Sequence, residues 1–400
     1  MSTPTRLVPL LRDAGWSFVL IGFLGRLPPA LAPLGVTLFA YDQLGSFAAA
    51  GSLTATLALG GAVGGPMVGK LSDRYGQRPI GIAATVLSSA ALAAFILLCR
   101  PTAPFWLLLA VAFLLGMGSP QVGSMARARW AAMARPRPDR AQAISTAMGY
   151  EGAADEAVFV VGPVTVAALA ALHPAAGLVA ALVLGLVAPL AFALHRSALP
   201  PGGGHEDAHV RVRWGPLVAL GFVCAGVGVV FGSSSTGIAA LMTEQARPGL
   251  IGLVYGAMGI GSAISGLSAS RVLAMWGQRR RVVTCAAAMC LVTPLFALTV
   301  HPAALAAVCF VSGLSLAPVL IGAFALAEQA APLSALSTVM TAMGTCVVVG
   351  VAAGASIAGP LIDRLSPSAA LMLPAVGAVV AFLFAALHWA LQRGTVSRGT

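Results

Sequence analysis

The sequence predicts an all-α polytopic membrane protein, that is, a chain that crosses a lipid bilayer many times. Hydrophobic residues make up 58% of the 400 residues and the mean hydropathy is +0.93, whereas soluble domains contain about 45–50% apolar residues. Only 9% of the residues are charged, and most of them fall between long apolar runs. Each run reaches the roughly 20 residues that a helix needs to cross a bilayer.

The apolar runs predict twelve transmembrane helices in two sets of six. The first set is expected at 15–39, 47–69, 79–99, 104–125, 142–170 and 175–195, and the second at 215–241, 249–271, 282–300, 303–327, 335–361 and 369–391. The sequence PPGGGHEDAH lies between the sets and is typical of a flexible polar linker. We therefore expect an N-terminal six-helix bundle at 1–195, a linker at 196–214 and a C-terminal six-helix bundle at 215–400.

Short internal repeats indicate that the second half of the chain copies the first. The tripeptide GQR occurs at 76–78 and again at 277–279, and TAMG occurs at 146–149 and again at 341–344. Both TAMG segments fall in the fifth predicted helix of their half. The two bundles are therefore expected to be pseudo-symmetric.

The basic residues predict the orientation in the membrane. If both termini are cytoplasmic, all but four of the 23 Lys and Arg residues lie on or near cytoplasmic segments, the exceptions being Arg26, Arg100, Arg247 and Arg364. Short loops rich in Lys and Arg remain on the cytoplasmic side of a membrane. Frequent Ala, Gly and Arg beside a single Lys fit a GC-rich bacterial genome, so we expect a multi-pass protein of the bacterial cytoplasmic (inner) membrane with both termini cytoplasmic.

The segment GPMVGKLSDRYGQR at 65–78 lies between the second and third predicted helices, and we expect it to form a short, structured loop outside the membrane. It resembles the signature G-x-L-a-D-R-x-G-R-k of the major facilitator superfamily, in which this loop gates conformational change. Gln77 departs from that signature, and the matching residues are Gly69, Leu71, Asp73, Arg74, Gly76 and Arg78. Asp73 is expected to lie against a neighbouring helix N-terminus, where the helix dipole favours its charge. The resemblance implies the major facilitator fold, with a substrate site near the midplane between the bundles.

Two further motifs resemble the twelve-helix drug:proton antiporter branch of that superfamily only in part. Gly162-Pro163 is similar to the Gly-Pro centre of the branch's fifth-helix signature, but Val166-Ala167 replaces the glycine pair that follows. In the fourth helix Gly116 matches, whereas Ala112 occupies the position of the branch's arginine. If the protein couples transport to protons, Arg26 is expected to supply the positive charge from a different helix.

Four charged residues fall inside predicted spans: Arg26 in the first helix and Glu151, Asp155 and Glu156 in the fifth. A charge at the centre of a transmembrane helix costs about 2.5–3.5 kcal/mol on insertion scales. Counted at 1.5 Å per residue, Arg26, Glu151 and Asp155 lie at similar depth. We therefore expect Arg26 to pair with Asp155 or Glu151 and the four residues to form a proton-coupling site. The structural alternative is an ion pair that only fixes helix packing.

The cavity between the bundles has weaker candidates. Ser233 and Ser312 belong to groups of small polar residues in the seventh and tenth helices, and such side chains commonly bond to backbone carbonyls of their own helix. The residues that we expect to line a substrate cavity are Arg26, Gln121, Tyr150, Phe159, Ser233, Tyr255, Met258 and Ser312.

Several other classes of function receive no support from the sequence. It contains no G-x-x-x-x-G-K-[ST] loop and no H-E-x-x-H spacing, and its six cysteines are not spaced as metal ligands. The basic residues do not form a patch of the kind that binds nucleic acid. We therefore expect no enzyme activity, no cofactor, no metal and no nucleic-acid partner.

The sequence leaves three hypotheses of function open. The first is a secondary active transporter that exports a small apolar or cationic organic compound by alternating access, in exchange for protons and as a monomer. The second is a carrier of a sugar, amino acid or other metabolite, an exporter or facilitator in which Arg26 binds the substrate. The third is a membrane sensor or lipid-handling protein that retains the fold without transport.

Overall fold

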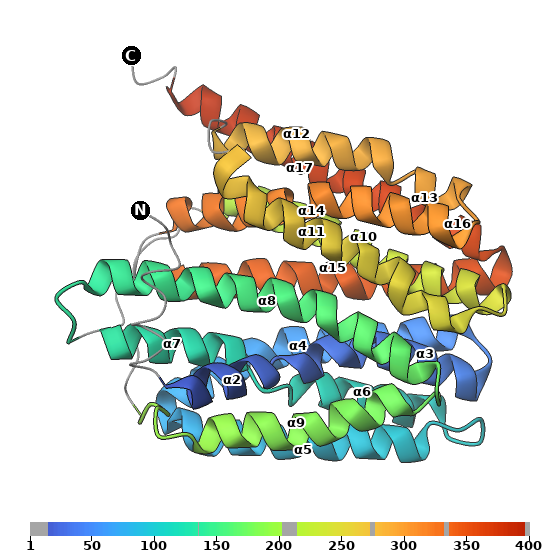
Figure 1. The fold of residues 1–400 in the computed structure, drawn as a ribbon, viewed down its shortest axis with the longest axis horizontal. Coiled ribbons are helices and arrows are strands. Elements are labelled where there is room, and N and C mark those ends of the chain that lie inside the picture. The colour runs from blue at the N-terminus through green and yellow to red at the C-terminus, as the bar shows by residue number, and fades with distance from the viewer. Residues whose placement is uncertain (1–14, 135, 202–213, 273–276, 332–335, 397–400) are drawn as a thin grey trace.

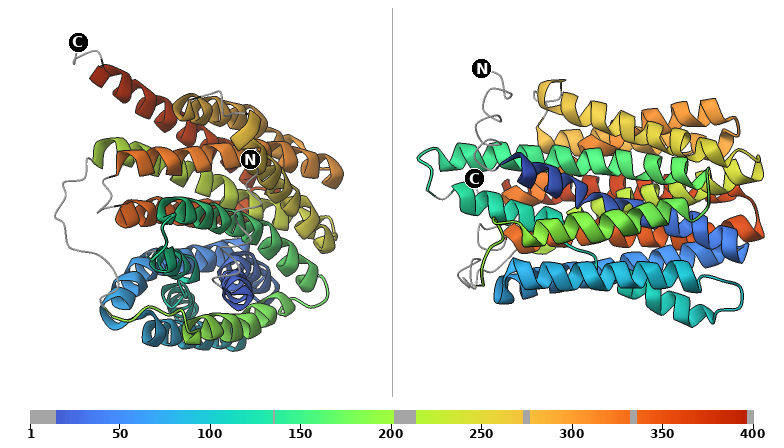
Figure 2. Two further views of the ribbon diagram at one scale, coloured as in Figure 1. Left: turned by 60° about the vertical axis from the view of Figure 1, so that its left-hand side comes forward. Right: turned by 60° about the horizontal axis from the view of Figure 1, so that its bottom comes forward.

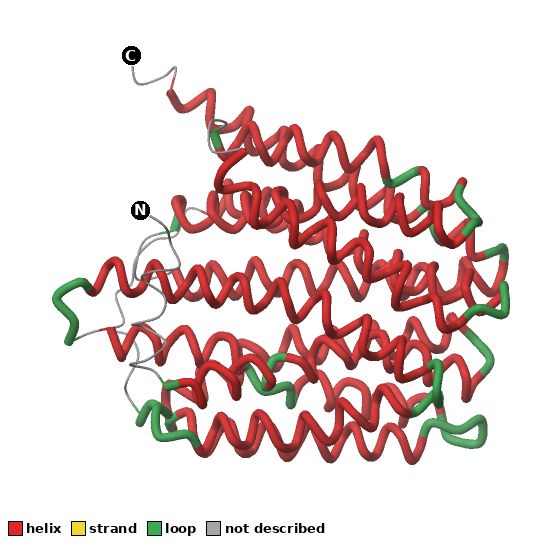
Figure 3. Tube along the Cα trace, viewed as in Figure 1, coloured by secondary structure: helices red, strands yellow, loops and turns green. Residues whose placement is uncertain are grey.

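A computed structural model describes residues 15–134, 136–201, 214–272, 277–331 and 336–396. Within these ranges all regular secondary structure is helical (Figure 3). Eleven helical segments are long and apolar enough to cross a membrane, and α8 (Arg140–Ala170) is a further helix of 31 residues. The predicted all-α polytopic class is therefore confirmed. The chain termini and residues 202–213 of the predicted linker lie outside the described ranges.

The helices follow one another in the predicted order (Figure 1). The first six spans contain α2 (Trp16–Leu24), α3 (Leu27–Leu44), α4 (Phe47–Tyr75), α5 (Gln77–Leu98), α6 (Phe105–Met117), α7 (Val122–Ala134), α8 and α9 (Ala176–Leu194). The last six contain α10 (Trp214–Glu244), α11 (Ile251–Val272), α12 (Gln278–Val292), α13 (Leu295–Leu298), α14 (Pro302–Ala330), α15 (Leu336–Arg364), α16 (Pro367–Ala370) and α17 (Leu373–Val396). A single 3-10 turn, η1 (Pro248–Leu250), precedes α11.

Two spans of the first bundle are interrupted within the membrane. The first span breaks at Gly25–Arg26, where α2 ends and α3 begins with prolines in its first turn. The fourth span breaks between Met117 and Val122, around Pro120. Proline lacks a backbone N–H and clashes with the preceding turn, so it breaks a helix or begins a new one. The fourth span then continues to Ala134, well past the predicted end at residue 125.

The segment at 65–78 is not the loop that the sequence predicted. Helix α4 continues through it to Tyr75, and α5 begins at Gln77. Gly76 alone makes the turn, with a φ of 91° that residues other than glycine rarely adopt. The hydropathy pattern marks the membrane boundary, whereas a helix can extend beyond it. Asp73 is exposed on the last turns of α4 and has no hydrogen-bond or ion-pair partner among the described residues.

Glycines allow very close helix contacts in both bundles. A Cβ added to Gly60 of α4 would lie 2.1 Å from the carbonyl oxygen of Phe113 in α6. In the second bundle, a Cβ on Gly261 of α11 would lie 2.1 Å from the carbonyl oxygen of Phe310 in α14. Small residues let helix backbones approach each other in membranes, where van der Waals packing drives association. The same pair of spans in each bundle thus packs backbone against backbone.

The two ends of the molecule differ in charge. We call one of them the basic end, because the helix ends there carry Arg74, Arg78, Arg137, Arg196 and Arg279. The opposite end carries Arg100, Arg247 and Arg364. The start of α2 and the end of α17 lie at the basic end (Figure 1).

The two bundles meet closely at the opposite end. A Cβ on Gly51 of α4 would lie 2.5 Å from the carbonyl oxygen of Ala355 in α15, and one on Gly252 of α11 would lie 2.7 Å from Ala167 of α8. Nearer the basic end, the same interface helices have open space beside Gly69, Gly152 and Gly344. Figure 2 shows the two bundles from two further directions. In this conformation the bundles are thus closed against each other at the opposite end.

The close contacts predict which glycines are essential for stability. We expect Gly60→Ala to lower the free energy of unfolding by about 1–3 kcal/mol, because the new Cβ would force the backbones of α4 and α6 apart. The matched control is Gly344→Ala, which adds the same group to a helix with open space beside it. Equilibrium unfolding in mixed micelles would measure both. Equal stability of the two variants would contradict this account of the packing.

Candidate functional site

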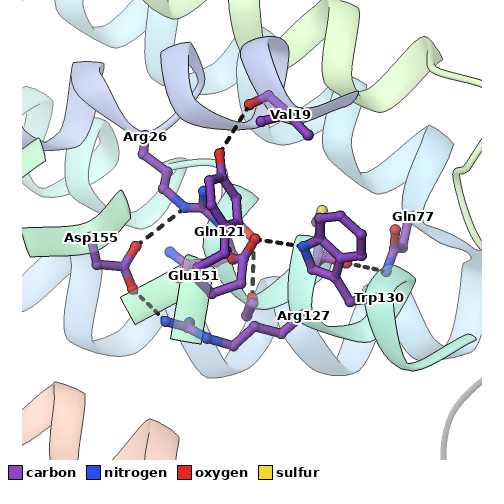
Figure 4. A network of polar contacts seen from close by, with 11 residues as sticks. Val19, Arg26, Gln77, Gln121, Arg127, Trp130, Glu151 and Asp155 are labelled. Atoms are coloured by element: carbon purple, nitrogen blue, oxygen red, sulfur yellow. Dashed lines mark hydrogen bonds and ion pairs between the residues drawn. The ribbon is translucent and has the colours of Figure 1, made fainter. Parts of the chain in front are cut away.

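Three of the four predicted intramembrane charges, Arg26, Glu151 and Asp155, lie together in the first bundle (Figure 4). Arg26, at the break between α2 and α3, faces the middle of α8. Its Nη2 donates a hydrogen bond to Oε2 of Glu151, and its Nε lies 3.2 Å from Oδ1 of Asp155. Arg26 therefore pairs with both of the acids between which the sequence could not choose.

A second arginine, Arg127 of α7, completes the cluster. Its Nη2 donates to Oδ2 of Asp155, so this carboxylate is shared between two guanidinium groups. We call Arg26, Arg127, Glu151 and Asp155 the charge cluster. It contains two positive and two negative groups, and this balance matters because an unpaired charge in a low-dielectric interior is very costly. The side chain of Glu156, the third predicted acid, lies outside the part that the structure describes.

The two acids occupy different environments. The Glu151 side chain is only 1% exposed, and its Oε1 accepts a hydrogen bond of 2.7 Å from the indole N–H of Trp130. Trp130 is fixed in turn by an edge-to-face contact with Phe18, at 5.0 Å between ring centroids. In contrast, the Asp155 side chain is 32% exposed and its partner Arg127 is 40% exposed. Glu151 is thus enclosed, whereas Asp155 can be reached.

Glycines at the two helix breaks make room for the cluster. Gly25 faces Val122, the first residue of α7, so the break in the first span lies against the break in the fourth. A Cβ on Gly123 would lie 3.3 Å from Nε of Arg26 and 3.7 Å from Oδ1 of Asp155. A larger residue at position 123 would therefore press on both members of the longer ion pair.

Arg129 forms a separate polar contact between α5, α7 and α9. Its Nε donates to Oε1 of Gln77 at 2.7 Å, and its Nη1 donates to the carbonyl of Phe192 at 2.9 Å and to the hydroxyl of Ser197 at 3.1 Å. The guanidinium also lies 3.7 Å from the centroid of the Phe192 ring. Gln77, which departs from the family signature, is thus the buried acceptor for a buried arginine.

His195 lies just beyond the end of α9, close to this contact. Burial, together with the nearby charges of Arg129 and Arg196, holds the pKa of His195 below its usual value. Its ring is therefore neutral near pH 7 and shares hydrogen bonds with Ser17 and Ser197. It adds no further positive charge to the basic end.

The predicted cavity residues of the first bundle lie near the charge cluster. Gln121 lies in the break of the fourth span, where its Nε2 donates to the carbonyl of Ser119 at 3.2 Å. Tyr150 precedes Glu151 and donates to the carbonyl of Val19 at 3.4 Å. The side chain of Phe159 lies outside the described part.

The predicted residues of the second bundle do not contact the charge cluster. Ser233 is buried and donates to the carbonyl of Val229 in its own helix. Met258 is buried where α11 packs against Gly313 of α14. Ser312 is buried with a hydroxyl that has no hydrogen-bond partner among the described residues, and Tyr255 is half-buried. These four predicted cavity residues therefore lie apart from the charge cluster.

Sequence reasoning missed three members of the site: Arg127, Trp130 and Gly123. Because the fourth span was predicted to end at residue 125, Arg127 was grouped with the cytoplasmic charges. The available signal was Ser119-Pro120, which marks a helix break in mid-membrane and implies that the span continues beyond it.

Twelve spans in two packed bundles are the architecture of a class of secondary transporters. The sequence profile of the Major Facilitator Superfamily matches residues 17–241. The chain therefore belongs to the Major Facilitator Superfamily and is a transporter. No curated protein matches the sequence as a whole or in part.

Solved structures of other transporters share the fold at low sequence identity. The nucleoside transporter NupG, as its D323A mutant, matches with a TM-score of 0.69 and 13% identity over 94% of this chain and 99% of its own. The POT family transporter PepTSo gives 0.70 and 13% over 96% and 98%. The human organic anion transporter MFSD10 gives 0.63 and 16% over 92% and 99%. At these identities the likeness concerns the fold alone.

The charge balance of the cluster predicts a non-additive effect on stability. Arg26→Met is expected to lower the free energy of unfolding by about 3–5 kcal/mol, because it leaves the enclosed Glu151 without its arginine. The double variant Arg26→Met with Glu151→Leu should regain most of this loss, since Asp155 keeps Arg127 as its partner. Equilibrium unfolding in mixed micelles measures both. If the double variant were less stable than Arg26→Met by the full loss measured for Glu151→Leu alone, the ion pair would not be what stabilises the site.

Proposed function

We propose that this transporter exchanges protons for a small apolar or cationic organic compound, which it exports across a bacterial inner membrane. The observation that carries the proposal is the pair of carboxylates on α8, the enclosed Glu151 and the accessible Asp155, each held by an arginine from another span. A carboxylate that is paired with arginine and also lies near an accessible surface can gain and lose a proton as its surroundings change. The four residues predicted to line the cavity from the second bundle, Ser233, Tyr255, Met258 and Ser312, are uncharged, which suits an apolar or cationic compound.

Asp155 is the proposed proton-exchanging group, because its side chain is exposed enough to meet water whereas Glu151 is enclosed. Protonation of Asp155 would remove its attraction to Arg26 and Arg127. Arg26 would keep Glu151 as a partner, whereas Arg127 would lose its only carboxylate among the described contacts. The freed guanidinium on α7 then repels a cationic substrate, so proton binding and substrate binding exclude each other.

The residues of the family signature have a proposed role in gating. Gly69, Asp73 and Arg74 lie on the last turns of α4, Gly76 makes the turn and Arg78 lies in the first turn of α5. Asp73 and Arg78 are exposed at the basic end, where the interface helices have open space. Closure of this end would bring a partner to Asp73.

One observation favours a different substrate class. Nη1 of Arg26 is buried and has no hydrogen-bond partner among the described residues. A buried, unsatisfied donor on a cation is suited to an anionic group. The alternative function is therefore a carrier or facilitator whose substrate, such as a metabolite with a carboxylate, binds Arg26.

The proposed orientation places the basic end in the cytoplasm, because Lys and Arg are retained on that side. Both termini would then be cytoplasmic. All four charges of the cluster come from one chain, so we propose that the monomer is the functional unit.

Flux in proteoliposomes tests the coupling. Driven by a pH gradient, flux of a lipophilic cation should fall to background in Asp155→Asn, because the exchanging carboxyl is lost. The matched control is Asp139→Asn, which removes an exposed acid from the same bundle whose described partner is Arg137. This control should retain the flux of the unchanged protein.

A different pattern of flux would replace the proposal with its alternative. Flux of a small carboxylate that needs no gradient, survives Asp155→Asn and disappears in Arg26→Gln would make the arginine a substrate ligand. If the protein is stable but carries neither the cation nor the carboxylate faster than protein-free liposomes do, a sensor or lipid-handling role would be favoured.

Thiol labelling tests the orientation. In a variant without the six native cysteines, Thr102→Cys at the opposite end should react with a membrane-impermeant maleimide added to intact cells. Asp139→Cys, at the basic end, should react only after the cells are opened. Both positions are exposed in the structure. The reverse pattern would contradict the proposed orientation.

A further inference from the structure

An acidic residue of the second bundle binds the first turn of a helix in the first bundle. Asp363 lies in the last turn of α15, at the opposite end of the molecule. Its Oδ1 accepts a hydrogen bond of 3.0 Å from the backbone N–H of Phe47, and its Oδ2 accepts one of 2.9 Å from the N–H of Ala48. The hydroxyl of Ser46 donates to the same Oδ2 at 2.6 Å. One carboxylate thus receives three hydrogen bonds across the interface between the bundles.

The first turn of α4 depends on this carboxylate. The first N–H groups of a helix have no partner within the helix and carry the positive end of its dipole. In α4, Ser46 is the N-cap and its side chain accepts only from the N–H of Ala49, and the first turn contains no acidic residue of its own. Asp363 therefore takes the place that an acidic residue of the same helix commonly fills.

This contact lies beside the closest approach of the two bundles. A Cβ on Gly359, one turn before Asp363, would lie 2.3 Å from the carbonyl oxygen of Phe47. On α4, Gly51 packs equally tightly against Ala355. The carboxylate can reach the N–H groups of α4 only while these backbones remain in contact. When the bundles separate at this end, all three hydrogen bonds break together.

Asp363 has a counterpart in sequence at the basic end. Asp73-Arg74 lies in the last turn of α4, and Asp363-Arg364 lies in the last turn of α15. These two helices form the tightest part of the interface and run in opposite directions through it. Asp73 has no hydrogen-bond or ion-pair partner among the described residues, whereas Asp363 has three donors. The aspartate that has hydrogen-bond partners is thus the one at the closed end of the molecule.

We propose that Asp363 is a conformational latch, which stabilises the state closed at the opposite end by capping α4 from the other bundle. In this role the negative charge matters as well as the shape of the side chain. An asparagine offers one acceptor oxygen and no charge, so it cannot replace the bonds to both N–H groups. The latch is independent of the coupling ion and the substrate, and it requires only that the bundles alternate between two closed ends.

Electron–electron distance measurements between spin labels test the latch. Labels on Thr102→Cys and Leu298→Cys, in a variant without the native cysteines, report the separation of the bundles at the opposite end; both positions are exposed. We expect Asp363→Asn to raise the ratio of open to closed distances by about tenfold in lipid nanodiscs, a change typical of losing a charge-assisted cap.

The matched control is Asp42→Asn, which removes an exposed acid at the same end whose hydrogen bond among the described residues is to Gln43 of its own bundle. Its distance distribution should equal that of the unchanged protein. Asp363→Glu should restore most of the closed population, and Ser46→Ala, which removes one of the three donors, should shift it by an intermediate amount. An unchanged distribution in Asp363→Asn, or an equal shift in Asp42→Asn, would overturn the proposal whatever the outcome of the flux measurements.

Discussion

The architecture of the first bundle depends on pairing four charged groups, of which Arg26 and Glu151 are buried. Removing a carboxylate or a guanidinium from water is so costly that it is tolerated only when ion pairs and hydrogen bonds compensate. Arg26 and Arg127 can meet α8 together because their two spans break at the same depth, with Gly25 against the start of α7. The two helix breaks and the glycine at position 123 thus serve the same requirement, which is to bring both arginines to the carboxylates of α8.

The two bundles share their packing but not their chemistry. Gly60 of α4 and Gly261 of α11 make equivalent backbone contacts in the two halves. The charge cluster, in contrast, has no counterpart among the described residues of the second bundle, where Ser233 and Thr236 bond to carbonyls of their own helix. A repeat in sequence therefore preserves the contacts that hold spans together, while the polar residues inside each bundle diverge.

The number and order of the spans could be predicted from hydropathy, because the thickness of the bilayer sets the length of an apolar run. The two-bundle fold was indicated by the internal repeats and by the signature at 65–78. The ends of the helices could not be predicted, because α4 extends to Tyr75, beyond its apolar run, and the fourth span continues as α7 to Ala134. Arg26 was found because it is an isolated charge in an apolar run and its depth matches that of the acids. Arg127 was missed because its helix was expected to end before it. The role of Gln77 also needed the structure, because its partner Arg129 lies 52 residues away in the sequence.

Small residues at the interface explain why a few polar contacts can govern the exchange between conformations. A glycine contact buries little apolar side-chain surface, so separating the bundles there loses little of the hydrophobic effect, and hydrogen bonds weigh more in the balance. Glycine contacts such as those of Gly51 and Gly252 give close packing without interlocked side chains, and such surfaces can separate cleanly. The conformation of least free energy is then decided by the polar groups that have partners in one state only. The accessible pair Asp155–Arg127 and the contact of Asp363 with α4 are groups of this kind, and they lie in different parts of the molecule. Protonation of Asp155 and capping of α4 by Asp363 can therefore shift the same equilibrium between conformations, although the two sites are not in contact.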